Sequence, residues 1–106
     1  MQRAMRTARA LAPEKPVWIT ETSVPSEAEQ PWVDELWQAK MVASVIGGFL
    51  AEGADRVFWH TLADAPGERV GPTGYATNSL FRGVEEGATV RYELKPSGEV
   101  FRRLAG

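Results

Sequence analysis

Two short apolar segments of this chain end in residues whose side chains could do chemistry. Residues 15–22 read Lys-Pro-Val-Trp-Ile-Thr-Glu-Thr and carry a carboxylate, Glu21, near their end. Residues 57–60 read Val-Phe-Trp-His and end in Trp59 and His60. Parallel α/β folds place their chemistry at the C-terminal ends of strands. A carboxylate at such an end, with tryptophans close by in sequence, points to sugar chemistry.

The composition narrows the classes of partner and cofactor. The 106 residues are enough for one small domain, and a net charge of -2 gives no reason to expect nucleic acid. The absence of cysteine excludes thiolate ligands and a cysteine nucleophile, and a single histidine excludes a multi-histidine metal site within one chain. We therefore expect no metal and no cofactor. The longest apolar run, residues 41–51, is too short for a membrane span of about 20 residues, and nothing indicates a compartment.

Periodicity, prolines and glycines predict the elements that must position these residues. Pro31 suits the first turn of a helix, and Gly53 suits the position just after its end. Ser97 is a good N-cap for a final helix. In chain order we expect a helix over 2–12, a strand over 17–21, a helix over 31–52, a strand over 55–61 and a helix over 98–104.

The strand–helix–strand pattern predicts a βαβ unit with two parallel strands and the long helix packed across them. Trp18, Trp32 and Trp37 are expected in the core, and Gly47 with its neighbour Gly48 is expected to allow close packing of the helix on the sheet. Two parallel strands expose unpaired edges and need cover on both faces. The expected fold class is therefore α/β, as one sector of a larger parallel sheet.

A long glycine-containing segment, residues 62–95, follows the second strand. Residues 89–94 could form a short strand or an extended segment. Tyr75, Asn78 and Phe81 could anchor the segment as an ordered rim loop that shapes substrate choice, and the alternative is a mobile insertion. Deletion of residues 66–88 is expected to leave the fold intact.

Three segments resemble a known family. Residues 15–22 resemble the seventh strand of retaining glycoside hydrolases of the (β/α)8 barrel (TIM barrel) superfamily called clan A, and residues 53–64 resemble the eighth. Residues 94–104, which begin Leu-Lys-Pro-Ser-Gly, resemble the last helix, where a Lys-Pro-Ala-like start is common. The resemblance implies a TIM-barrel βαβ segment, the last quarter of the barrel. It also implies a carbohydrate substrate and the family's nucleophilic glutamate at Glu21.

The chain departs from that family in ways that bear on activity. A whole barrel needs about 250 residues and eight strands, so residues 1–106 correspond to a single partial domain. The family's acid/base glutamate follows an Asn at a strand end, whereas the only Asn here is Asn78. We therefore expect the chain to need the rest of the barrel or a partner chain, and to be inactive alone. The alternative is a non-catalytic α/β module that binds carbohydrate or a protein partner.

Each candidate site residue also has a structural reading. Retaining glycosidases use two carboxyls about 5–5.5 Å apart, and Glu21 fits the nucleophile, while the alternative is a solvated strand-end acid. Trp59 could be a sugar platform or a core side chain, and we expect it to face inward with Val57. His60 is either a site residue or a structural histidine. Asp64 could bond a sugar hydroxyl, or it could be a solvated loop acid.

Overall fold

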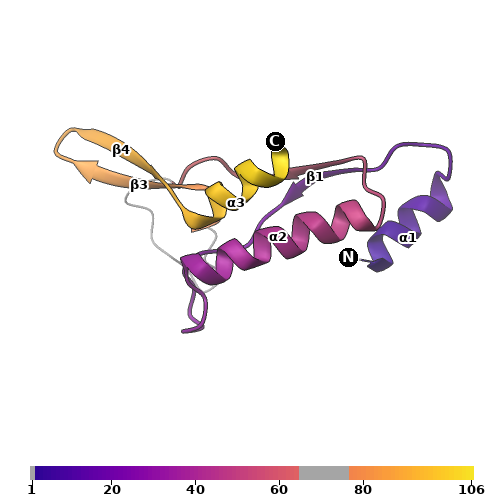
Figure 1. The fold of residues 1–106 in the computed structure, drawn as a ribbon, viewed down its shortest axis with the longest axis horizontal. Helices are drawn as coiled ribbons and strands as arrows, with labels where there is room; N and C mark the ends of the chain where they lie inside the picture. Colours follow the sequence, from indigo (N-terminus) through magenta and orange to yellow (C-terminus); the bar gives the residue numbers. More distant parts are fainter. Residues whose placement is uncertain (1, 65–76) are drawn as a thin grey trace.

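The computed structural model describes residues 2–64 and 77–106. They form an elongated body of 52 × 29 × 20 Å, with α1 near one end and the β3–β4 hairpin at the other (Figure 1). The elements in chain order are α1 (Gln2–Leu11), β1 (Trp18–Thr22), α2 (Glu35–Ala51), β2 (Arg56–Trp59), β3 (Phe81–Glu86), β4 (Thr89–Leu94) and α3 (Pro96–Ala105).

The predicted βαβ pattern is confirmed. Strands β1 and β2 are parallel neighbours, with Ile19 opposite Val57, and α2 connects them. Asp55 fixes the start of the pair, because its Oδ2 accepts the backbone N–H of Val17 at 2.7 Å and its own N–H donates to the Val17 carbonyl at 2.8 Å. β1 is shifted by one residue from its predicted bounds, and β2 is shorter than predicted by one residue at its start and two at its end. Differences of this size are usual for strand ends.

The register of β1 shifts before its end. Ile19 lies opposite Val57, but Thr22 lies opposite Trp59, so three steps along β1 match two along β2. An extra residue of this kind is a β-bulge, which breaks the alternation of side chains. Thr22 is half-buried and Glu21 is exposed. Simple alternation along β1 from Ile19 to Glu21 therefore does not describe how Glu21 is oriented.

The long helix begins four residues later than predicted. Asp34 is its N-cap, with extended backbone and a side-chain Oδ1 that accepts the Trp37 N–H at 2.7 Å. An aspartate cap satisfies a free helix donor, which proline cannot do, so Pro31 lies in the preceding turn. The end of the helix is as predicted, because Glu52 is the C-cap and Gly53 follows with a φ of 92°.

The final helix, in contrast, begins two residues earlier than predicted. Pro96 occupies its first turn and Lys95 is the N-cap, without a side-chain capping bond. Ser97 is therefore inside the helix, where it is fully buried. Proline at the first helical position is favoured because its missing N–H would have no partner there. The prediction of Ser97 as the N-cap is wrong for that reason.

The segment after β2 contains an antiparallel hairpin of which only half was predicted. Of the two alternatives for residues 89–94, the short strand is the one observed, as β4, whereas β3 was not predicted. The two strands pair over six residues each and turn at Gly87, which has a φ of 61°. A glycine at the first position of a two-residue turn is a hairpin signature that the sequence does carry. Tyr75 lies outside the described residues.

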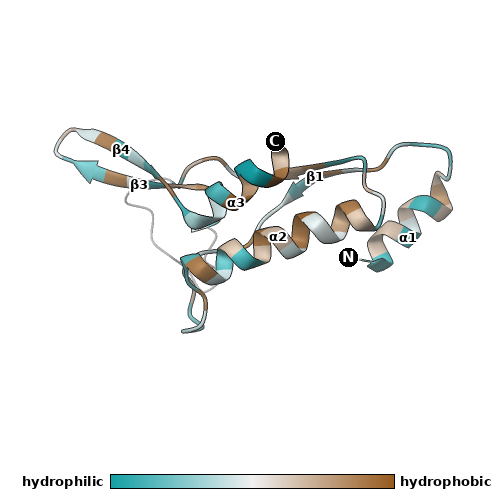
Figure 2. Cartoon of the chain, viewed as in Figure 1, coloured by the Kyte–Doolittle hydropathy of each residue, from teal (hydrophilic) through white to brown (hydrophobic). Residues whose placement is uncertain are grey.

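The core is small and is formed mainly where α2 meets α3. Figure 2 shows apolar residues along much of α2, and the buried apolar side chains include Val42 and Ile46 on that helix. The core positions predicted for Trp18 and Trp32 are wrong. Trp18 is 54% exposed because α2 contacts α3 and β2 and leaves that part of β1 uncovered, and Trp32 lies in the exposed turn before α2. A Cβ built at Gly47 would touch nothing, so that glycine is not required by close packing.

The described residues thus form a mixed α/β structure with three helices, a parallel strand pair and a hairpin. Within this part of the chain, the parallel pair has no third strand on either edge. Free strand edges and exposed apolar side chains are surfaces at which other strands or chains can add.

Candidate active site

Glu21 and His60 lie together at the C-terminal end of the parallel pair. Their nearest side-chain atoms, Glu21 Oε1 and His60 Nδ1, are 3.8 Å apart. The His60 backbone N–H donates to the Thr22 carbonyl at 2.9 Å, which continues the pairing of β1 and β2 past the last residue of β2. The peptide bond that follows His60 is cis. The hydrogen bond between His60 and Thr22 holds Glu21 and His60, which are 39 positions apart in sequence, side by side.

Both side chains are open to solvent. Glu21 is 73% exposed and His60 is 49% exposed. At 3.8 Å their contact is longer than a hydrogen bond, so the interaction is a weak electrostatic one. Because the Glu21 carboxylate makes no strong hydrogen bond with the described residues, its oxygens are available to a substrate. The pair could therefore present a nucleophile or general base, with an imidazole beside it as a donor or acceptor.

Trp59 lies beside this pair with one polar contact already made. Its indole Nε1–H donates to the Asn78 carbonyl at 2.9 Å, and the residue is half-buried, as is Val57 on the same strand face. Trp59 and Val57 share one face of the strand, as expected, and the inward direction of that face in a barrel stays a prediction. A buried hydrogen bond at one edge of the ring orients the indole plane, and the remaining ring surface can pack or stack.

Asp64 occupies a different environment from the other predicted site residues. Its Oδ2 lies 2.6 Å from Lys95 Nζ, and its Oδ1 accepts the Ser79 N–H at 3.0 Å. Its side chain is largely buried, so the solvated-acid alternative is wrong. Both carboxylate oxygens serve the protein itself. A contact of Asp64 with a sugar hydroxyl stays a prediction that this arrangement does not favour.

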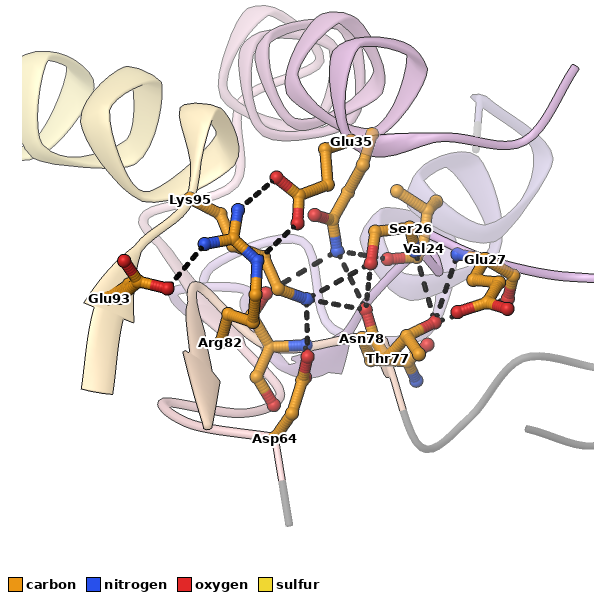
Figure 3. A network of polar contacts seen from close by, with 12 residues as sticks. Val24, Ser26, Glu27, Glu35, Asp64, Thr77, Asn78, Arg82, Glu93 and Lys95 are labelled. Carbon is orange, nitrogen blue, oxygen red and sulfur yellow. Dashed lines mark hydrogen bonds and ion pairs between the residues drawn. The ribbon is translucent and has the colours of Figure 1, made fainter. Parts of the chain in front are cut away.

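A buried polar network joins the loop after β1 to the ends of the later elements (Figure 3). Its centre is the Thr77 carbonyl oxygen, which accepts hydrogen bonds from Lys95 Nζ at 3.0 Å and from Gln38 Nε2 at 3.1 Å. Ser26 donates to the same oxygen through its N–H and its hydroxyl, both at 3.1 Å. Lys95 is only 1% exposed, so its charge depends on Asp64 and on these oxygens.

Gln38 completes the network from α2. It is fully buried, and its Nε2 also donates to the Val24 carbonyl at 2.9 Å. The sequence carried a signal for this role, because Gln38 falls on the same helical face as Val42 and Ile46. A polar residue in an apolar stripe is usually buried with partners. Lys95 gave no comparable signal, since its burial depends on segments far away in the chain.

A second polar cluster lies closer to the surface. Arg82 on β3 pairs with both carboxylate oxygens of Glu35 at the start of α2, and its Nη1 donates to Glu93 Oε1 at 3.2 Å. The hydrogen bond to Glu35 is the main cause that raises the pKa of Arg82 above its ordinary value. This cluster ties the hairpin to α2, and it contains none of the predicted site residues.

The rest of the described chain contains neither a metal-binding cluster nor a membrane-spanning helix. Across residues 2–64 and 77–106, no three His, Cys, Asp or Glu side chains come together in a way that could hold a metal ion. None of the helices described is both long enough and apolar enough to cross a membrane.

Comparison with known proteins adds no relative. No family model matches the chain, and no curated protein is significantly similar to it. A functional argument therefore rests on the residues and geometry of this chain.

Proposed function

We propose that this chain is the C-terminal part of a retaining glycoside hydrolase, with Glu21 as the nucleophile. The observation that carries the proposal is the pairing of Glu21 and His60 at the C-terminal end of two parallel strands. In a (β/α)8 barrel that end of the strands forms the active site. The β-bulge between Ile19 and Thr22, an interval that contains Glu21, supports the same assignment, because bulges commonly re-aim a side chain next to an active site.

The proposed reaction is a double displacement. A Glu21 oxygen attacks the anomeric carbon and forms a glycosyl ester as the glycosidic oxygen leaves with a proton from an acid. Water then attacks the same carbon, gives its proton to the conjugate base of that acid, and releases Glu21 as a carboxylate. In this scheme the His60 imidazole lies next to the Glu21 carboxylate, and the sugar stacks on the free ring surface of Trp59.

The acid/base residue must come from outside this set of strand ends. The end of β2 offers an imidazole rather than a second carboxylate, and the only Asn in the chain is followed by Ser79. The unpaired edges of β1 and β2 are where further strands would add. The proposal therefore includes either the remaining barrel strands or a partner chain that supplies them.

The nucleophile can be tested without the missing acid. In a 2,4-dinitrophenyl 2-deoxy-2-fluoroglycoside the leaving phenolate is stable without protonation, so attack by Glu21 alone can displace it. We expect incubation of the chain with gluco-, galacto-, manno- and xylo-configured reagents to add one fluoroglycosyl group, mapped to Glu21 by peptide mass spectrometry. Glu21→Gln should not be labelled, and Glu27→Gln, which changes an exposed acid in the following loop, should be labelled normally.

Absence of label at Glu21 with all four reagents would contradict the nucleophile assignment. A specific observation would then favour the second candidate, a module that binds a partner. Trp18 and Phe58 form an exposed aromatic pair with ring centroids 6.1 Å apart, and the Arg56 guanidinium lies 5.5 Å from the Trp18 ring centre. Exposed aromatic and arginine side chains are typical of contact surfaces. Sugar binding without labelling would assign the chain to that class.

A further inference from the structure

Asn78 connects the ends of both strands, although nothing in its sequence context marks it as a site residue. Its backbone carbonyl accepts the Trp59 indole N–H at 2.9 Å. Its side-chain Nδ2 donates to Ser23 Oγ at 2.9 Å. Ser23 is two residues after Glu21, so one residue holds the loop beyond the proposed nucleophile and the ring beside it.

Asn78 is itself held rigidly. It is 5% exposed, and it lies between Thr77, the centre of the buried network, and Ser79, whose N–H donates to Asp64 Oδ1 at 3.0 Å. The charge that anchors Asp64 comes from Lys95. A residue whose two neighbours are fixed by buried bonds has little freedom to move, so its contacts transmit a fixed geometry.

We infer that Asn78 is a positioning residue that sets the distance and orientation between Trp59 and the loop that follows Glu21. The inference rests on the proposed function in so far as it names Trp59 as a sugar platform. A positioning residue acts on the orientation of the bound substrate. Small displacements of the groups that orient a substrate strongly reduce the rate of the chemical step. We call the contacts of Asn78 with Trp59 and Ser23 the Asn78 clamp. The Oδ1 atom of Asn78 is buried and has no hydrogen-bond partner among the described residues, so it remains an unused acceptor beside these contacts.

The contact with Ser23 gives the inference a matched pair of variants. Asn78→Ala removes the donor, and Ser23→Ala removes the acceptor while leaving Asn78 intact. Both should loosen the Asn78 backbone and thereby weaken its bond with the Trp59 indole. Ser44→Ala, which changes an exposed serine on α2, is the control.

The readout is the indole Nε1–H of Trp59, assigned by its loss in Trp59→Phe, in nitrogen-15 spectra of the whole chain. A net hydrogen bond contributes about 0.5–1.5 kcal/mol, which corresponds to about a two- to tenfold change in an equilibrium. We expect the Trp59 indole proton to exchange about two to ten times faster with solvent in Asn78→Ala and in Ser23→Ala, with no further increase in the double variant. Ser44→Ala should match the unaltered chain.

Unchanged indole exchange in Ser23→Ala, with the rest of the spectrum retained, would overturn the inference, whether or not Asn78→Ala folds. A fully additive double variant would also overturn it, because two residues that act through one bond cannot contribute independently. A titration with a cello-, xylo- or manno-oligosaccharide mixture separates the two proposals. If sugars leave the Trp59 signal unmoved in the unaltered chain while both alanine variants still speed its exchange, the sugar platform is wrong and the clamp stands.

Discussion

Lys95 Nζ lies 2.6 Å from Asp64 Oδ2, and this buried ion pair joins the start of α3 to the segment that leaves β2. The two residues are held together with the loop after β1, because Lys95 also donates to Ser26 Oγ at 3.1 Å. Three segments that are distant in sequence therefore meet around one charge. Removal of that charge should affect the whole end of the molecule that carries Glu21.

The first prediction concerns this pair. Lys95→Met should lower the free energy of unfolding by about 3–5 kcal/mol, because it leaves the Asp64 carboxylate buried without its partner. The double variant Lys95→Met with Asp64→Leu should recover most of the loss, since apolar replacements of a buried pair are often neutral. Urea denaturation measures both. Arg91→Met, which breaks exposed ion pairs with Glu86 and Glu93, should change stability by no more than about 1 kcal/mol.

The second prediction separates the role of Glu21 from the stability of the fold. Glu21→Gln should change the free energy of unfolding by less than about 0.5 kcal/mol, because the side chain is largely exposed and its contact with His60 is long. The same urea experiment measures it. A loss of more than about 1.5 kcal/mol would show that Glu21 supports the strand pair rather than standing free for chemistry.

The third prediction is that the chain by itself does not turn over 4-nitrophenyl glycosides. Double displacement needs a second carboxyl group, and the strand ends described here present only Glu21. Release of nitrophenolate is followed by absorbance over hours at high protein concentration. Turnover that disappears in Glu21→Gln would prove this prediction wrong and would require an acid/base within the chain.

The fourth prediction follows from the exposed aromatic pair and the free strand edges. The chain should self-associate as its concentration rises, because apolar area on Trp18 and Phe58 is left in water. Trp18→Ser with Phe58→Ser should shift sedimentation toward the monomer. Tyr92→Ser on the hairpin serves as the control for loss of an exposed aromatic side chain. A monomer at all concentrations before any substitution would indicate a self-sufficient fold.

The fifth prediction concerns acid stability of the last helix. Hydrogen bonds from Arg102 and then Arg103 lower the pKa of Glu99 below its ordinary value of 4.5. A carboxyl with a lowered folded pKa stabilises the fold above its ordinary pKa, and this contribution is lost as the pH falls through the folded pKa. Glu99→Gln should therefore flatten the decline of the melting temperature between pH 6 and pH 3. An unchanged decline would show that these exposed pairs contribute nothing.

The structure contradicts the expectation that residues 66–88 can be deleted while the fold is kept. The sequence predicted that residues 66–88 could be removed without loss of fold. That range includes Asn78, Ser79 and all of β3, which are paired or buried. Its deletion would remove the centre of the polar network, so the fold is not expected to survive it.

Local sequence determined the two strands, β1 and β2, and the helix α2 that connects them. The apolar runs before Glu21 and His60 specify strands, the long apolar helix between them specifies a parallel connection, and Gly53 specifies the helix end. These features follow from interactions between residues a few positions apart, which a linear pattern records. The helix starts were not predicted because two local signals compete at each of them. Before α2, Pro31 competes with the Asp34 cap. Before α3, Ser97 competes with Pro96 in the first turn.

Tertiary structure alone decided which polar residues are buried and which aromatic residues are not. The burial of Asp64 could not be predicted from the sequence, because its partner, Lys95, lies 31 residues further along the chain. Asn78 is held by Trp59, which lies on β2, and by Ser23, which lies just after β1. Trp18 stayed exposed because α2 packs mainly against α3. Contacts between distant segments depend on how the elements fit together in space, and no periodicity within one element encodes that fit.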